Sequence, residues 1–185
     1  MRTHTRNPRP RKLKAVLGLT AIAALALPVS ATGAGSGGVG TEGSDVPTGS
    51  EATLDHGKAI PPADAPPQVV AAIEAANKIR KKPYVYGGGH QRWRSDGYDC
   101  SGAVSYALGP RGAGLIKRPM DSGEYMSWGR RGKGSWISVF ANSGHVYAVI
   151  AGLRWDTSMT PGDGPGWSKK MRSARGYKKR HKSPL

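Results

Sequence analysis

The sequence predicts an α+β fold with two helices followed by a small antiparallel sheet. Two segments with a helical pattern, near residues 68–82 and 100–108, come before the strand-like runs WISVF and HVYAVIAGLRWDTS. Helices that precede neighbouring strands, instead of alternating with them, favour the α+β class. The 185 residues are enough for one domain with its own hydrophobic core.

Residues 1–31 have the layout of a secretory signal peptide. MRTHTRNPRPRKLK carries six basic residues and no acid, and the apolar run AVLGLTAIAALALPVSA ends in small residues, so cleavage after Ala31 or Ala34 fits. Because the apolar run is short and interrupted by Pro28, we expect secretion and no stable membrane span; a retained anchor is the alternative.

Residues 32–67 are predicted to be a flexible linker, since they are rich in Gly, Ser, Pro and acids and poor in large apolar side chains. The domain is expected to occupy residues 68–166. It begins with a helix over 68–82 that ends at Pro83. The apolar face of this helix is formed by Val69, Ile73, Ala76 and Ile79.

The remaining elements follow from glycine and proline positions. YVYGGG is expected to enter a glycine turn, and Cys100–Leu108 is expected to form a helix closed by Gly109 and Pro110. The Gly- and Arg-rich stretch that follows reads as a loop with one helical turn near residues 122–128. A tight turn at Ala151 and Gly152 makes HVYAVI and LRWDT antiparallel strands.

The formal net charge is +16, and +10 remains once the six positive charges of the predicted signal are removed. Residues 167–185 carry eight Lys or Arg and no acid, which predicts a basic tail. Three roles stay open for this tail: a solvated extension, a binder of anionic wall polymers, and a nucleic-acid arm. Nucleic acid is the least favoured partner, because two interleaved aromatic residues, Trp167 and Tyr177, are a weak signal.

Cys100 is the only cysteine, so no internal disulfide can form and the thiol is free for chemistry. Asp99 and Ser101 are residue types that cap helices, and AVSYAL is compatible with a helix. Cys100 is therefore expected at the first helical turn, where the backbone dipole stabilises a thiolate. The alternative is a buried cysteine that acts as a small hydrophobe.

A nucleophilic cysteine needs a base and a group that orients the base. His145 opens a strand, a rigid position, whereas His90 in GGGHQRW is expected to be poorly held. Counting across the predicted turn places Asp156 opposite Val146 or His145, where its carboxylate can accept from the imidazole. A strand-edge surface histidine and an ordinary turn acid are the competing interpretations.

Three segments, PYVYGGG, YDCSGAVSYAL and SGHVYAVIAG, resemble the NlpC-type (NlpC and p-sixty) cell-wall cysteine peptidases of the papain-like superfamily. DCSG is the specific part, and the match covers residues 83–157. The resemblance implies a papain-like core, with helices packed on a small antiparallel sheet. It also implies that Cys100 is the nucleophile, His145 the base and Asp156 the orienting residue.

The resemblance further implies a peptidoglycan endopeptidase or amidase that cleaves peptide bonds in stem peptides, often the one joining D-glutamate to diaminopimelate. Tyr84 is expected to lie beside the nucleophile and to help the Cys100 backbone N–H stabilise the oxyanion. Asp99 and Ser101 are assigned to the same oxyanion and substrate region. No cofactor is implied, and one cysteine with scattered histidines does not indicate a zinc site.

The sequence departs from the family pattern in three places. WISVFANSG replaces a usual Pro-Gly-Asp segment, Asp156 stands where histidine is more usual, and a Gly- and Arg-rich insertion separates Leu108 from Trp136. That insertion replaces a segment that usually helps to shape the substrate groove. The alternative function is a non-catalytic module of the same fold that holds the wall through its groove and basic tail.

Overall fold

The computed structural model describes residues 50–159 and 164–185. The predicted signal peptide and the first part of the predicted linker lie outside these residues. The helices are α1 Pro67–Ile79, α2 Cys100–Leu108 and α3 Ser122–Tyr125. The strands are β1 Thr53–Asp55, β2 Lys58–Ile60, β3 Arg130–Arg131, β4 Ile137–Ala141, β5 Val146–Ile150, β6 Leu153–Asp156, β7 Gly166–Ser168 and β8 Lys178–His181.

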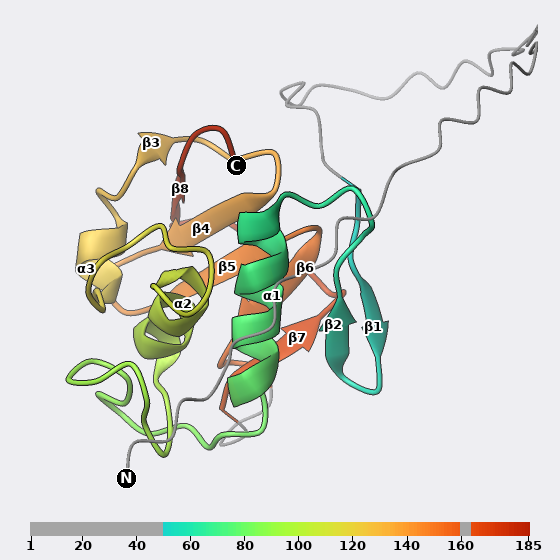
Figure 1. Cartoon of the computed structure of the whole chain (residues 1–185). Coiled ribbons are helices and arrows are strands. Elements are labelled where there is room, and N and C mark those ends of the chain that lie inside the picture. Colours follow the sequence, from blue (N-terminus) through green and yellow to red (C-terminus); the bar gives the residue numbers. More distant parts are fainter. Residues whose placement is uncertain (1–49, 160–163) are drawn as a thin grey trace, which may run out of the picture. The chain divides into compact units, whose positions relative to one another are not determined.

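The main sheet has six strands in the order β3-β8-β4-β5-β6-β7, and every neighbouring pair is antiparallel. Helices α1 and α2 pack against each other and cover one face of this sheet (Figure 1). The expectation of helices together with a small antiparallel sheet is therefore confirmed. The helical turn expected near residues 122–128 is also present, as α3.

Helix α1 forms where the apolar spacing predicts it. Pro67 occupies its first turn, where the missing N–H costs nothing, and the four predicted face residues are all buried. The helix ends at Ile79, three residues before the predicted end. In the part of the chain that the structure describes, no helix combines the length and the apolar character needed to cross a membrane.

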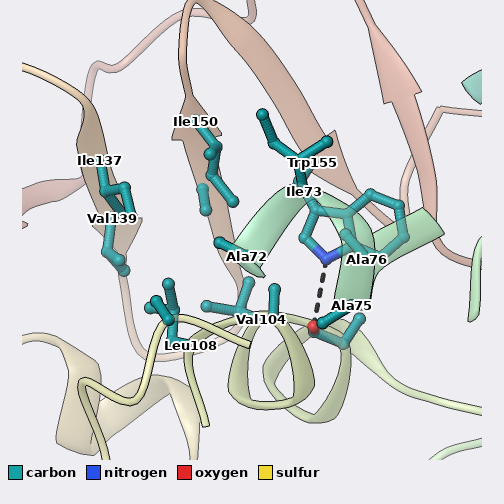
Figure 2. Packing of buried hydrophobic residues seen from close by; sticks show 14 of the residues in the cluster. Ala72, Ile73, Ala75, Ala76, Val104, Leu108, Ile137, Val139, Ile150 and Trp155 are labelled. Atoms are coloured by element: carbon teal, nitrogen blue, oxygen red, sulfur yellow. Dashed lines mark hydrogen bonds between the residues drawn. The ribbon is translucent and has the colours of Figure 1, made fainter. Parts of the chain in front are cut away.

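Strict side-chain alternation in the central strands builds the core. Ile137, Val139, Ile150 and Trp155 point towards α1 and α2 and meet apolar residues of both helices (Figure 2). The fully buried Trp155 donates its indole N–H to the Ala103 carbonyl of α2, 3.1 Å away. This contact fixes α2, and with it Cys100, relative to strand β6.

The prediction of a flexible linker is wrong for residues 53–60. They form the β1–β2 hairpin, whose turn is made by His56 and Gly57 at positive φ. The buried Ala59 exchanges two hydrogen bonds with the side chain of Asn77 on α1, and the same amide oxygen accepts the indole N–H of Trp167. Two hydrogen bonds between Ala59 and Asn77 help to dock this hairpin on α1, and hydrophobic patterning gives no sign of them.

The prediction of a separate basic tail is also wrong, because residues 167–185 complete the sheet. β7 is one edge strand, and β8 lies between β3 and β4 at the other side. The KKRH sequence of β8 has no apolar alternation, so its pairing rests on backbone hydrogen bonds to its neighbours. The folded domain therefore extends beyond the predicted boundary at residue 166.

Replacing Asn77 by Ala should destabilise the fold by about 2–4 kcal/mol, since it leaves the N–H and C=O of Ala59 and the indole N–H of Trp167 buried without a partner. Denaturant unfolding measures this change. Lys78→Ala, at the exposed neighbouring position of α1, should stay within about 0.5 kcal/mol of the parent. Equal stabilities for both variants would contradict the role of Asn77.

Candidate active site

Cys100 is the first residue of α2, as the capping pattern predicts. Asp99 has extended backbone angles and its side chain accepts the Gly102 N–H at 2.7 Å, so it is the N-cap. The Cys100 backbone N–H belongs to the helix terminus, which has no partner within the helix. The half-buried thiol thus sits at the positive end of a nine-residue helix dipole.

A glycine loop packs directly on this first turn. A Cβ atom on Gly102 would lie 2.0 Å from the Gly88 carbonyl oxygen, so only glycine permits this approach. The approach brings the YVYGGG segment alongside Cys100. The exposed side chains of Tyr84 and Tyr86 therefore line the same cleft as Cys100.

His145 is held by the turn that joins β4 to β5. The Asn142 side-chain oxygen accepts the backbone N–H groups of Gly144 and His145, and the Asn142 N–H donates to the His145 carbonyl. This closed turn fixes the backbone immediately before β5. The prediction of a rigid position for His145 agrees with this geometry.

Cys100, His145 and Asp156 come together at this end of the sheet. His145 Nε2 donates to Asp156 Oδ1 at 2.8 Å. Nδ1 is therefore the ring nitrogen left for the hydrogen bond between His145 and the Cys100 thiol. The imidazole is thus hydrogen-bonded to the carboxylate on one side and coupled to the thiol on the other.

The predicted register of Asp156 is wrong by at least one residue. The β5–β6 ladder runs from Ile150↔Leu153 to Ala148↔Trp155. Continuing this register places Asp156 opposite Tyr147, and not opposite Val146 or His145. The turn residues Ala151 and Gly152 both have positive φ, which makes this the tightest form of hairpin. The imidazole reaches back along the strand to meet the carboxylate.

The Asp156 carboxylate is 1 % exposed and surrounded by donors. Oδ1 accepts from His145 and from the backbone N–H of Ser158, and Oδ2 accepts from Arg172 Nη1 at 3.1 Å. Arg154 Nε lies 3.6 Å from Oδ2 and adds a second arginine charge. Sequence analysis missed Arg172, because a lone arginine within a basic run carries no signal.

These contacts shift the proton equilibria of the site. Burial opposes ionisation of Cys100, but hydrogen bonds from His145 and the Val146 backbone and the charge of His145 outweigh it, so the thiol pKa is lowered. Burial likewise opposes the imidazolium, yet the bonds to Asp156 and Cys100 raise the pKa of His145 to about 9. Burial also opposes ionisation of Asp156, but the hydrogen bond with His145 and the charge of His145 outweigh it, so the pKa of this carboxyl is lowered. Both shifts favour the thiolate–imidazolium pair over the neutral thiol and imidazole.

Cys100 opens into a cleft of about 340 Å³. Tyr84 lies on this cleft, and burial, followed by the charges of Cys100 and Asp99, raises the pKa of its phenol, which keeps it a hydrogen-bond donor. The cleft is lined by Tyr84, Tyr86, Gly87, His90, Asp99, Cys100, Ser101, Asp121, Ser122, Ser143 and Gly144.

Asp99 and Ser101 line the cleft, but their hydrogen bonds go to the protein itself. Besides capping α2, Asp99 accepts from the Gly87 N–H and faces His90 Nε2 at 3.0 Å, and Ser101 Oγ lies 3.1 Å from the same imidazole. His90 is thus firmly held, and the expectation that it is poorly held is wrong. The sequence did indicate Asp99 as a helix cap, and this residue is the partner that holds His90.

The described residues do not indicate a metal site. Within residues 50–159 and 164–185, no group of three or more His, Cys, Asp or Glu side chains is placed to hold a metal ion.

Comparisons with known proteins leave the family of the chain unassigned. No family model matches, and no curated protein matches either. A solved structure of a mutated resuscitation promoting factor interacting protein, RipA, aligns at 22% identity with a TM-score of 0.46, over 61% of this chain and 61% of that one. The chain thus spans about three fifths of the length of that protein. Function is therefore inferred from the residues of this chain.

The thiol–imidazole pair predicts iodoacetamide labelling of Cys100 well below about pH 8. In Asp156→Asn the imidazolium loses the carboxylate that raises its pKa, so the thiolate is less stabilised and labelling moves to higher pH. Intact-mass spectrometry of timed samples gives the rates. Asp96→Asn removes an exposed carboxylate away from the site and should leave the profile unchanged. Labelling of the parent only above about pH 8.5 would contradict an activated thiol.

Proposed function

We propose that this protein is a secreted cysteine peptidase that hydrolyses peptide bonds in the stem peptides of peptidoglycan. The observation that carries the proposal is the Cys100 thiol at a cleft, coupled to a His145 imidazole that is hydrogen-bonded to the buried Asp156. This arrangement is the one that nucleophilic catalysis by a thiol needs.

In the acylation step the Cys100 thiolate attacks the carbonyl carbon of the scissile bond. The developing oxyanion meets the backbone N–H of Cys100 and the hydroxyl of Tyr84. His145 then gives its Nδ1 proton to the leaving amine as the C–N bond breaks. The products of this step are a thioester on Cys100, a neutral imidazole and the released amine.

In the deacylation step the neutral imidazole takes a proton from water, and the hydroxide formed attacks the thioester carbonyl. The C–S bond breaks, the product leaves as a carboxylic acid that loses its proton to solvent, and the proton kept on His145 restores the thiolate–imidazolium pair. Asp156 accepts from Nε2 throughout, so Nδ1 always faces the thiol. Rate should therefore fall as pH rises through about 9, where His145 loses the proton that the leaving amine needs.

The substrate class rests on the DCSG, PYVYGGG and SGHVYAVIAG segments, which resemble cell-wall peptidases. The N-terminal layout supports export to a compartment where such substrates occur. Exposed cations of β3 and β8 form one basic region: Arg130, Arg131, Lys178 and Lys179. This region supports retention on anionic wall polymers, in place of the separate tail that the sequence predicted.

Digestion of purified peptidoglycan tests the proposal. The purified protein should release stem-peptide fragments, and Cys100→Ala and His145→Ala should release none, because each lacks a group that forms or breaks a bond in the scheme. Mass spectrometry of the soluble products identifies the cleaved bond. His56→Ala, which changes an exposed histidine of the β1–β2 turn, should retain full activity.

Two outcomes would contradict this function. Equal fragment release by the parent and Cys100→Ala would remove the thiol from the mechanism. No release by any variant, with all of them sedimenting with the wall, would favour the non-catalytic binding module.

A further inference from the structure

The connection between β7 and β8 crosses the face of the sheet that α1 and α2 leave uncovered. β7 is the edge strand beside β6, whereas β8 pairs with β4, so the intervening residues 169–177 must pass β6, β5 and β4. They pass on the far face, because Arg172 and Tyr177 both contact Tyr147, and the side chain of Tyr147 points away from the helices. The chain thus carries residues of the C-terminal segment to the back of the site.

Arg172 is held on this face by four contacts. Its guanidinium carbon lies 5.4 Å from the ring centroid of Tyr147 and 5.4 Å from that of Tyr177, whose rings are arranged edge to face. Nη1 donates to Asp156 Oδ2 at 3.1 Å and to Ser158 Oγ at 2.7 Å. Ser158 Oγ in turn donates to Asp156. Two aromatic rings and a hydroxyl therefore fix the guanidinium against the carboxylate.

The two oxygens of Asp156 share the Ser158 hydroxyl but otherwise have different partners. Oδ2 faces the two arginines, Arg172 and Arg154, whereas Oδ1 faces His145 and the Ser158 N–H. Rotation of the carboxylate would place Oδ1 against the arginines and break the bond to the imidazole. A guanidinium locked on Oδ2 prevents this rotation.

We propose that Arg172 is a positioning residue of the peptidase, which holds the Asp156 carboxylate in the rotamer that aims His145 at Cys100. Arg172 lies outside the residues that line the substrate cleft, so it acts through Asp156 and not on the substrate.

The charged and titratable groups around His145 come from every element that packs there. From the helix side these groups are Cys100 of α2 and its N-cap Asp99. From the sheet they are Tyr147 of β5 and Arg154 and Asp156 of β6, and from the crossing segment they are Arg172 and Tyr177. Arg172 is the cation among them that directly hydrogen bonds to Asp156. Its removal should therefore change both the orientation and the pKa of His145.

This inference rests on the proposed function, and pH–rate profiles of Arg172→Gln and Arg172→Lys test it. In Arg172→Gln, kcat should fall roughly 10- to 100-fold with KM nearly unchanged, since the imidazole is misaligned while the cleft is intact. The basic limb should move to lower pH, because the hydrogen bond with Asp156 that raises the pKa of His145 is weakened. Arg172→Lys keeps the charge but not the planar guanidinium, so kcat should also fall, while its basic limb should move less than that of Arg172→Gln.

The matched control is Arg175→Gln, an exposed arginine of the same crossing segment, which should match the parent. A kcat or basic limb of Arg172→Gln equal to that of the parent would overturn the proposal, because loss of folded protein alone leaves the limb in place. If Arg172→Gln does not fold, Arg172→Lys decides, and a parental kcat in that variant overturns it.

Iodoacetamide labelling separates this inference from the proposed function. It reports the Cys100–His145 pair without any substrate. An ordinary thiol in the parent would reject the peptidase itself. An activated thiol in the parent, with the same labelling profile in Arg172→Gln, would reject only the role of Arg172.

Discussion

A buried negative charge, the carboxylate of Asp156, is the constraint on which the candidate site depends. An isolated carboxylate at this depth would be strongly disfavoured, so its donors must be supplied by the fold. They come from β6, from the turn before β5, and from the segment that crosses the sheet to β8. The antiparallel order of the sheet places all three at one end of β5. The same contacts orient the His145 imidazole, so the groups that stabilise the Asp156 charge also align the site.

The nucleophile is positioned by a second, independent set of contacts on the other face of the sheet. Trp155 anchors α2 to β6 through Ala103, and Gly102 lets the glycine loop close over the first turn. Adjacent residues of β6 thus serve the two halves of the site: Trp155 holds the helix that bears the thiol, and Asp156 holds the imidazole. Strand alternation sends one to each face. A shift of register in β6 would disturb both halves together.

The parts of this site that local sequence patterns describe could be predicted. Capping residues around Cys100, apolar spacing in α1 and the turn at Ala151 depend on a few neighbouring residues, and each expected element is present. Contacts between distant segments could not be predicted. β8 is a strand without apolar alternation, the β1–β2 hairpin docks through one asparagine, and Arg172 gains its partner only because the chain crosses the sheet. The prediction of the residue opposite Asp156 was wrong for the same reason, because a one-residue change in strand pairing leaves no local pattern in the sequence.

The central claim is that Cys100 forms a covalent bond with the substrate, and trapping of the thioester tests it most directly. Digestion of soluble stem peptides is quenched in acid within seconds, and the intact protein is weighed by mass spectrometry. The account predicts an adduct equal in mass to the acyl portion of the cleaved peptide, located on Cys100, and its absence in Cys100→Ala. Product formation with no adduct in the parent, or an adduct on another residue, would contradict it.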